Sequence, residues 1–409
     1  MLQLILEFNH YQRLPKQPML IPQMPTLGLP LIKRSRTSCL TNGLGQWTNI
    51  PQSGRQIKPN LRTPPPAGKS MPRRVEFTKA GSPSTIRVAE MPLPEPKSSE
   101  IRIKVAFAGI NFADLLMRLG FYQPRPPYPF TPGYEVSGVI DALGDENTGF
   151  TIGQRVVAAM STGGQASHVV VDKNRVLVLP DEIELDVAAA MPVTYLTAHH
   201  MLHHLGHMGK DDSVLIHGGA GGVGTAALQL CQWAGVTKVW ATASGSKSEI
   251  IESLGGRAID RHNEDFVSII KKETEGAGVD HILDPIGGEH LTRSLSVLKE
   301  GGRLYTYGMS AAAPTAKRSL LRTYLAWRKT PAFDPLRLMT RNRGVFGVHM
   351  GTWKDETVMQ AQLKRILEGI MSGALSPIID SIFDVENVAE AHQYLHDGKN
   401  IGKVLLRFK

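Results

Sequence analysis

A glycine-rich run from His217 to Gly224 is the clearest functional signal in this chain of 409 residues. It contains the pattern G-x-G-x-x-G, follows a run that predicts a buried strand, and opens a predicted helix. Glycine permits a tight turn and lets a pyrophosphate approach the backbone, while the start of the helix offers free N–H groups and a positive dipole. The run therefore predicts a dinucleotide-binding loop, with a purely structural tight turn as the alternative. The predicted cofactor residues of this loop are Gly219, Ala220, Gly221, Gly222, Val223 and Gly224.

The stretch after the next predicted strand indicates which dinucleotide binds. An NAD site usually has Asp or Glu about 20 residues further along, where the carboxylate binds the ribose 2′-OH. No acid stands between 242 and 248 here, and basic and hydroxyl side chains occur instead. Such side chains can hold a 2′-phosphate by charge-assisted hydrogen bonds. We therefore predict NADPH rather than NADH, although Lys247 could also be an ordinary lysine at a helix start. The predicted 2′-phosphate residues are Ser244, Ser246, Lys247 and Arg261.

Two patterns of secondary structure surround these residues. From 213 to 307, predicted strands and helices alternate, which is typical of a doubly wound parallel sheet. From 71 to 191, short alternating strands are separated by glycine turns, which favours a small β-barrel. After about residue 340 the sequence predicts a long helix, a strand, a short helix and a final strand, which could complete the barrel domain. The predicted fold class is α/β.

Charge and composition exclude several classes of protein. The net charge of +9 lies almost wholly in residues 1–70, where nine Lys or Arg and one acid contribute +8 and leave +1 for the remainder. A near-neutral body argues against a nucleic-acid-binding face. Two cysteines, Cys39 and Cys231, are too few for a disulfide framework or a four-thiolate zinc site. No apolar run reaches the about 18 residues that a membrane-spanning helix needs.

Residues 1–70 differ from the body in composition. They hold ten of the 27 prolines and predict a disordered or non-native tail. Sequence upstream of a start at Met71 is the favoured interpretation, and a mitochondrial transit segment or a tether to a membrane or partner is the alternative. We expect a cytoplasmic protein, or a mitochondrial one if the tail is a transit segment.

Five short motifs in the body occur together in a known family. They are Gly109–Asp114, Thr131–Glu135, Asp284–Gly288, Thr306–Met309 and Asn400–Val404. Together with the glycine loop, they resemble the zinc-free quinone oxidoreductase branch of the medium-chain dehydrogenase/reductase superfamily. Within that branch, the stretches 243–247, 342–349 and 379–381 are most similar to the VAT-1 homologues. The resemblance covers about 71–409.

This resemblance implies a fold, an activity and further site residues. It implies a GroES-like β-barrel catalytic domain from 71–192 and 341–409, and a Rossmann domain from 193–340, with the active site between them. It implies hydride transfer from NADPH to a quinone or an α,β-unsaturated carbonyl, without flavin, in a homodimer. Four more cofactor contacts follow from it: Thr197, Gly308, Phe346 and Lys403.

The resemblance also assigns the catalytic residues. Asn111 would lie closest to the nicotinamide and the substrate carbonyl, where its amide can donate to a developing oxyanion. Zinc alcohol dehydrogenases have Cys where Asn111 stands and His where Tyr134 stands, so we expect no zinc and no alcohol dehydrogenase activity. Asp114 would orient its neighbours or cap a short helix, and Tyr122 would line the pocket or pack as an ordinary aromatic residue. Some quinone reductases have a tyrosine where Leu116 stands, so a proton donor is lost there.

Two other segments allow more than one interpretation. Five histidines between 199 and 207 have helical spacing, and we favour a surface helix that titrates near pH 6.5 over a metal site. Residues 311–340 mix six basic side chains with apolar ones, which fits a lid, a dimer contact or a weak contact with an anionic membrane surface. The alternative to an enzyme is therefore an NADPH-binding protein at a vesicle or membrane surface, with weak or no turnover.

Overall fold

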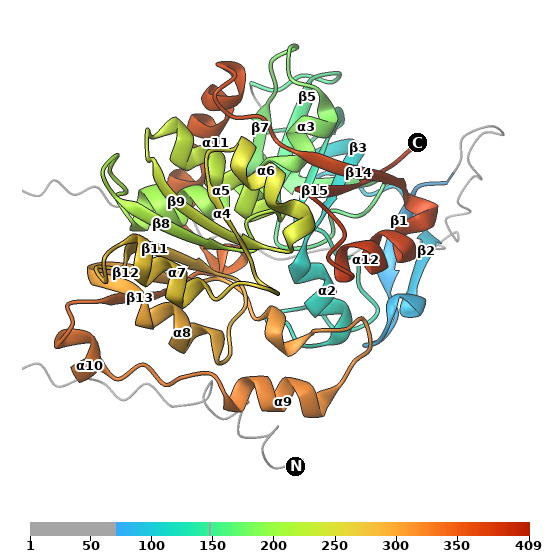
Figure 1. Ribbon diagram of the computed structural model, residues 1–409. Coiled ribbons are helices and arrows are strands. Elements are labelled where there is room, and N and C mark those ends of the chain that lie inside the picture. Colours follow the sequence, from blue (N-terminus) through green and yellow to red (C-terminus); the bar gives the residue numbers. More distant parts are fainter. Residues whose placement is uncertain (1–70, 147–148) are drawn as a thin grey trace, which may run out of the picture. The chain divides into compact units, whose positions relative to one another are not determined.

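A six-stranded, wholly parallel sheet forms the centre of one half of the molecule (Figure 1). The computed structural model describes residues 71–146 and 149–409, so the predictions for residues 1–70 lie outside the described residues. The strand order is β10-β9-β8-β11-β12-β13. From β8 the chain adds strands towards one edge of the sheet, and from β11 it adds them towards the other edge. Ligands of such sheets bind at this switch point. The strands are β8 (Ser213–His217), β9 (Lys238–Ala243), β10 (Arg257–Asp260), β11 (Val279–Asp284), β12 (Leu298–Thr306) and β13 (Gly344–Gly347).

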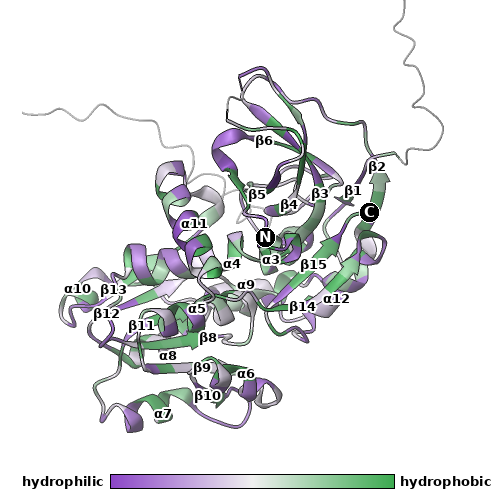
Figure 2. Ribbon diagram, turned by 90° about the horizontal axis from the view of Figure 1, so that it is seen from above, coloured by the Kyte–Doolittle hydropathy of each residue, from purple (hydrophilic) through white to green (hydrophobic). Residues whose placement is uncertain are grey.

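Helices connect these strands and cover both faces of the sheet, which is the predicted Rossmann arrangement (Figure 1). Strand β8 is buried along its whole length, and its three central residues, Val214, Leu215 and Ile216, are all apolar rather than alternating (Figure 2). The helix Gly222–Trp233 is buried over residues Gly224–Cys231, because it packs against a neighbouring helix as well as against β8 and β9. The helices are α4 (Pro192–His199), α5 (Gly222–Trp233), α6 (Ser248–Ser253), α7 (Phe266–Glu273) and α8 (His290–Ser296).

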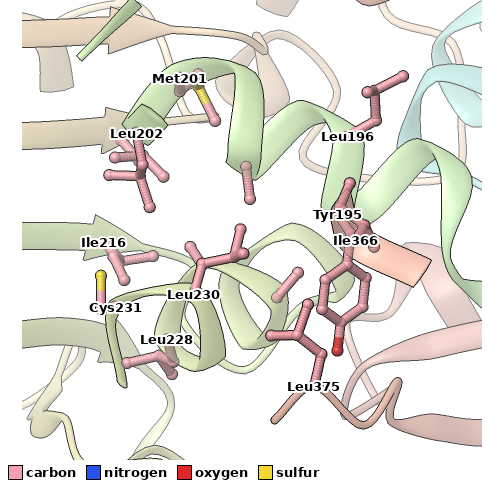
Figure 3. Close-up of a cluster of buried hydrophobic side chains, with 14 of the residues drawn as sticks. Tyr195, Leu196, Met201, Leu202, Ile216, Leu228, Leu230, Cys231, Ile366 and Leu375 are labelled. Carbon is pink, nitrogen blue, oxygen red and sulfur yellow. The ribbon is translucent and has the colours of Figure 1, made fainter. Parts of the chain in front are cut away.

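The main core lies between the sheet and the helices α4, α5 and α11 (Glu356–Met371). Figure 3 shows apolar side chains of α4 and of the π-helix that follows it (His200–Leu205) above those of α5 and β8. Cys231 is fully buried in this cluster, and burial raises the pKa of its thiol to about 12. It therefore acts as a small apolar residue.

A second sheet, mostly antiparallel, forms the other half of the molecule. Its order is β14-β15-β3-β4-β5-β7, and β6 also pairs with β3. The C-terminal strand β15 pairs with β3, so the end of the chain returns to this sheet. The strands are β3 (Glu100–Ile110), β4 (Glu135–Leu143), β5 (Arg155–Ala159), β6 (His168–Asp172), β7 (Val176–Val178), β14 (Ile379–Asp384) and β15 (Lys403–Arg407). A separate hairpin pairs β1 (Arg73–Phe77) with β2 (Ile86–Glu90).

Short helices complete the antiparallel half and the long connection before β13. Helix α2 (Phe112–Leu119) directly follows β3, and α3 (Leu185–Ala190) and α12 (Val388–His396) pack on the same sheet. Helices α9 (Leu320–Arg328) and α10 (Pro335–Met339) lie between β12 and β13. No helix among residues 71–146 and 149–409 has the length and hydropathy that crossing a membrane requires.

The sequence placed one boundary too early. The parallel domain was expected to end at residue 340, but β13 pairs in parallel with β12 and is the edge strand of that sheet. Helix α11 also contributes Leu363, Ile366 and Leu367 to the core beside the parallel sheet. The prediction failed because β13 has only four residues and follows a long connection, so its pattern does not reveal its partner.

Candidate functional site

One cavity of about 700 Å³ is lined by residues from both halves of the molecule. The parallel half contributes the glycine loop and the residues after β12 and β13, at the switch point of the sheet. The antiparallel half contributes the end of β3, the helix α2 and the start of β15. This volume lies within the about 300–1,000 Å³ that is usual for small-molecule sites.

The glycine loop has the geometry that a pyrophosphate requires. Gly221, Gly222, Val223 and Gly224 line the cavity at the start of α5, where the first amides of a helix have no partner inside the helix. A Cβ atom on Gly224 would lie 2.3 Å from the carbonyl oxygen of Gly218, and one on Gly219 would lie 2.6 Å from Cβ of Ala241. These two glycines allow the helix and strand to pack closely. A Cβ on Gly221 would meet only the Gly218 oxygen, at 3.3 Å.

The predicted 2′-phosphate residues are close in the fold but differ in position. Arg261 lines the cavity and is exposed. The hydroxyls of Ser244 and Ser246 lie 3.4 Å apart just after β9. Lys247 is half-buried, and its ammonium donates to the carbonyl oxygens of Gly398 and Asn400, 2.6 Å from each. Burial lowers the pKa of Lys247. Because Gly398 and Asn400 themselves line the cavity, Lys247 lies directly behind its edge.

The four cofactor contacts implied by resemblance do not all lie at the cavity. Thr197 and Gly308 line it, and so does Lys403. Phe346 does not line it, because its ring stacks on Tyr305 in the core, with ring centres 5.7 Å apart. The residues after it, Val348 and His349, line the cavity instead.

Asn111 belongs to a buried polar cluster on the antiparallel side. Its Nδ2 donates to Oε1 of Glu135 at 3.0 Å, and its Oδ1 accepts from the ammonium of Lys403 at 2.6 Å. Lys403 also donates to Oε1 of Glu135, and the other oxygen of Glu135 accepts from the backbone N–H of Val193 at 2.7 Å. Asn111 and Lys403 both line the cavity. These contacts fix the orientation of the carboxamide.

Asp114 supports Asn111 and does not itself reach the cavity. Its carboxylate accepts from the backbone N–H of Asn111 at 2.8 Å and from that of Gly133 at 3.1 Å. Burial raises its pKa to about 7. The predicted catalytic candidate is therefore a capping residue that joins α2 to the turn before β4, which is the alternative that the sequence left open.

Apolar and aromatic side chains line the part of the cavity beyond Asn111. Tyr122 packs on the ring of His349 with centres 5.0 Å apart, and burial raises the pKa of its hydroxyl. Arg175 and Glu356 form an ion pair at 3.0 Å, half-exposed at the cavity edge. We call the apolar part the acceptor lobe; it comprises Leu116, Tyr122, Tyr134, Met160, Leu196, Met350, Met359 and Leu363.

Sequence reasoning missed two functional positions. Glu135 was quoted only as part of a motif, yet its buried carboxylate holds both Asn111 and Lys403. Gly109 makes room for it, because a Cβ there would lie 2.2 Å from Oε1 of Glu135. The signal existed in the motif 109–114, but the sequence does not show that this glycine faces residue 135.

One group of side chains in the described part of the chain could be considered for a metal. His217, Asp284 and His290 have ligand atoms within 4.8 Å of one another. Asp284 accepts from His290 at 2.8 Å and from Ser294 at 2.9 Å. Burial raises its pKa, but the hydrogen bond from His290, the charges of His217 and His290 and the backbone N–H of Gly287 together hold it at about 2. His217 bonds Thr242 and Ser294 through its two ring nitrogens. The group is therefore a closed hydrogen-bond network that joins the ends of β8 and β11.

The histidine-rich segment is not a surface helix. His200 is 1% exposed, and its Nδ1 lies 3.2 Å from Nε2 of Gln362. Burial lowers the pKa of both His200 and His203 to about 4, so both are neutral at pH 6.5. The prediction of a titrating surface was wrong because α11 covers this face, and a helical pattern of histidines does not reveal such a cover.

Two family models match the chain. One, described as "Alcohol dehydrogenase GroES-like domain", matches residues 97–181, and the other, described as "Zinc-binding dehydrogenase", matches residues 255–406. Zinc at this fold is held by thiolate, imidazole or carboxylate ligands. An amide at Asn111 and a phenol at Tyr134, whose pKa is raised by burial, do not fit a tetrahedral zinc site at these positions.

Relatives resemble most of the described chain. It is 37% identical to "Synaptic vesicle membrane protein VAT-1 homolog" of Danio rerio, over 76% of this chain and 65% of that protein. It is 36% identical to the Homo sapiens protein of the same name, over 76% of this chain and 80% of that protein. Identity to the Homo sapiens "Quinone oxidoreductase" is 29%, over 83% of this chain and 98% of the other.

Two solved structures have the same fold. The human VAT-1 homolog-like protein superposes with a TM-score of 0.72 and 30% identity, covering 83% of this chain and 99% of that one. A mycobacterial protein complexed with NADPH gives a TM-score of 0.72 and 27% identity, covering 82% of this chain and all of that one.

Proposed function

The chain belongs to the medium-chain dehydrogenase/reductase superfamily, in the group of VAT-1 homologues and quinone oxidoreductases, and on this premise we propose that it is an NADPH-dependent reductase of quinones or α,β-unsaturated carbonyls. One observation carries the proposal. A single cavity joins the amides of a dinucleotide-binding glycine loop to a fixed carboxamide, Asn111, and to the apolar acceptor lobe. The likeness to a protein complexed with NADPH supports the cofactor.

Residues on the page fit the cofactor. The free amides of Gly222, Val223 and Gly224 would hold the pyrophosphate, and Arg261 with Lys247 would hold the 2′-phosphate. Thr197 would lie beside the nicotinamide. When bound, NADPH supplies a hydride, which means two electrons and one hydrogen.

The protein's own contribution is to hold the acceptor and stabilise charge. The acceptor lobe excludes water and offers flat aromatic and flexible methionine surfaces to a conjugated acceptor. Reduction leaves negative charge on a carbonyl oxygen of the acceptor. Asn111 can donate its second Nδ2–H to that oxygen, because Glu135 accepts only the first and Lys403 fixes the plane of the amide. A preorganised donor of this kind contributes about 2.7–4 kcal/mol to the transition state.

Steady-state kinetics test the proposal. The 409-residue chain is assayed for oxidation of NADPH and NADH with 1,4-benzoquinone, 9,10-phenanthrenequinone and a medium-chain 2-enone as acceptors. We expect saturable turnover with NADPH well above NADH, and the best acceptor decides between quinone and enone reductase. Micromolar NADPH binding without turnover on any acceptor would overturn the reductase proposal.

A second candidate function rests on the surface of α9 and α10. Seven large apolar side chains there are exposed: Leu320, Leu321, Tyr324, Leu325, Trp327, Leu336 and Met339. Basic residues lie among them, and such a surface fits shallow contact with an anionic membrane. The protein would then act as an NADPH-binding protein at a membrane surface, with weak or no turnover.

Vesicle binding separates the two candidates. The full chain is sedimented with phosphatidylserine and with phosphatidylcholine vesicles. Substitution of Arg322, Arg328 and Lys329 by Gln should abolish binding to the anionic vesicles if α9 carries the contact. Unchanged binding would mean that another part of the chain, such as the basic residues 1–70, is responsible.

We further propose that the protein is a homodimer. Among the described strands, only β12 pairs with β13, so one edge of the parallel sheet is open to a second copy. Sedimentation velocity on the full chain at micromolar concentration tests this, and a species of about 45 kDa only would contradict it.

A further inference from the structure

Arg118 is a cation that the fold buries completely. It stands in the last turn of α2, and its exposed fraction is 0%. Its Nη1 donates to the carbonyl oxygen of Gly81 at 2.8 Å, and the N–H of Gly81 donates to the carbonyl oxygen of Arg118 at 3.0 Å. These two bonds hold the end of α2 against the turn between β1 and β2.

One edge of the Arg118 guanidinium has no hydrogen-bond partner among the described residues. Nε and Nη2 form this edge, and both atoms are buried without donating to any residue that the structure describes. A guanidinium holds its N–H groups in a rigid planar fork, so the N–H of Nε and the nearer N–H of Nη2 point the same way. Such a pair of donors fits one small anion.

His392 of α12 supplies a further donor close to Arg118. Its side chain is fully buried, and neither ring nitrogen has a partner in the described part of the chain. Helix α12 packs on α2. Burial lowers the pKa of His392 well below 6.5, and the nearby charge of Arg118 lowers it further, so the ring is neutral at pH 7. A neutral imidazole still has one N–H to donate.

The positive charge of Arg118 is not balanced within the described residues. Burial lowers its pKa to about 10, so the group is still protonated at pH 7. The described ionisable neighbour that acts on this pKa is Tyr128, which is neutral because burial raises its own pKa. The carbonyl groups at the end of α2 offer only partial negative charge. A buried cation without an anion is strongly unfavourable, so this place requires one negative charge.

We propose that Arg118 and His392 form a buried binding site for one small monovalent anion, a halide such as chloride. A single negative charge matches the single guanidinium, because His392 is neutral. Phosphate or sulfate would bring a second negative charge and more acceptor atoms than these two side chains can satisfy. A spherical ion needs only the fork of Arg118 and the one N–H of His392. The site is separate from the cofactor loop and does not depend on the proposed function.

The anion would join elements that also form the wall of the acceptor side. Asn111 caps the start of α2, and Leu116 on the same helix lines the acceptor lobe. Leu395 and His396 of α12 line the cavity as well. An anion held between α2 and α12 would therefore stabilise the folded wall of the cavity, and it would take no part in hydride transfer.

Thermal melting of the full chain tests the site. Sodium gluconate is replaced stepwise by sodium chloride at constant ionic strength, and gluconate is too large for a buried fork. A ligand that binds only the folded state raises the melting temperature as its concentration exceeds the dissociation constant. We expect a rise of about 3 °C or more from gluconate to chloride. Equal melting temperatures of the unmodified protein in the two salts would overturn the inference.

Two variants assign the chloride effect to these side chains. Arg118→Met removes the charge, so in gluconate it should melt at or above the unmodified protein, and chloride should raise its melting temperature no further. His392→Phe keeps the ring but loses the N–H, and it should need about fivefold to tenfold more chloride for the same rise. Arg341→Met, a substitution of an exposed arginine, is the matched control and should keep the full chloride effect. A chloride effect that persists in Arg118→Met would overturn the inference.

A measurement on the unmodified protein keeps the test valid if Arg118→Met does not fold. Bromide resembles chloride in charge and size and scatters X-rays anomalously. Crystals of the full chain grown in sodium bromide should show an anomalous peak within hydrogen-bond distance of Nε and Nη2 of Arg118. A water molecule at this place, with no anomalous peak, would overturn the inference. None of these measurements uses NADPH or an acceptor, so failure of the reductase proposal would leave their outcome unchanged.

Discussion

The cofactor side and the acceptor side of the cavity are built by different means. On the cofactor side, one continuous run, 221–224, lines the cavity, and glycine matters at Gly222 and Gly224, where an added Cβ would lie 2.8 Å from Cγ2 of Thr194 and 2.3 Å from the Gly218 oxygen. On the acceptor side, the polar groups are side chains from three separate strands or their ends: Asn111 after β3, Glu135 at the start of β4 and Lys403 at the start of β15. Backbone recognition is local in sequence, whereas side-chain recognition depends on how distant segments pair.

The two sides should therefore fail differently when altered. A change on the acceptor side should affect the rate of reduction. A change on the cofactor side should affect the affinity for NADPH or the stability of the fold. Three substitutions test this difference, and the acid sensitivity of the histidines beside α11 is a fourth and smaller effect.

Asn111→Leu should give the largest loss. The leucine fills a similar volume but cannot donate to the acceptor oxygen, and it leaves Lys403 paired with Glu135 alone. We expect kcat to fall by about 100-fold to 1,000-fold, as when one oxyanion donor is removed. Stopped-flow measurement of NADPH oxidation tests this. A large rise in the dissociation constant of NADPH with unchanged kcat would contradict the division between the two sides.

Gly224→Ala should weaken the cofactor side through packing. The added Cβ would lie 2.3 Å from the Gly218 oxygen and 2.6 Å from Cα of Gly219, so α5 must move away from the loop. Overpacking of this kind costs about 1–3 kcal/mol. We expect a lower melting temperature and weaker NADPH binding by calorimetry. Gly221→Ala is the control, because its closest contact would be 3.3 Å and its melting temperature should stay near that of the unmodified protein.

Lys247→Met should affect NADPH and spare NADH. A hydrogen bond to a charged group contributes about 1.5–3 kcal/mol, but the ammonium must first leave the carbonyls of Gly398 and Asn400. We therefore expect the dissociation constant of NADPH to rise by about tenfold, near 1.4 kcal/mol, and that of NADH to stay the same. Equal weakening of NADPH binding and NADH binding would mean that Lys247 holds the loop 398–400 in place and does not contact the 2′-phosphate.

Acid should destabilise the protein through the buried histidines beside α11, with the smallest effect on the cavity itself. The pKa of His200 and of His203 falls to about 4 in the folded state, below the ordinary 6.5, because burial disfavours the charged form. The unfolded chain thus binds more protons between pH 6.5 and 4. The contribution of these two histidines to the free energy of unfolding should be complete above pH 6.5 and should decrease as the pH falls towards 4.

Urea titrations at several pH values measure this decrease. The double variant His200→Gln, His203→Gln should show a smaller decrease between pH 6.5 and 4. His262→Gln, a substitution of an exposed histidine, is the control. An unchanged slope in the double variant would assign the acid sensitivity to other groups.

The limits of sequence reasoning follow from particular residues. The glycine loop was located correctly because its pattern and its flanking strand and helix are contiguous. The resemblance assigned Asp114 and Phe346 to the site, but the carboxylate of Asp114 accepts from backbone amides and the ring of Phe346 stacks on a core tyrosine. A position adjacent in sequence can point to the opposite side of an element, and a motif does not record that direction.

The sequence alone determined the superfamily, the α/β class, the parallel sheet with its dinucleotide loop and the near-neutral body. The superfamily follows from the resemblance of several short motifs to a known family. The other properties depend on local periodicity, on glycine spacing and on composition, which are all contained in short stretches. The tertiary structure alone decided that β13 belongs to the parallel sheet, that His200 is buried, and that Glu135 joins Asn111 to Lys403. The last contact links residues 292 positions apart. The pairing of β3 with β15 brings them together, and that pairing is a property of the folded chain.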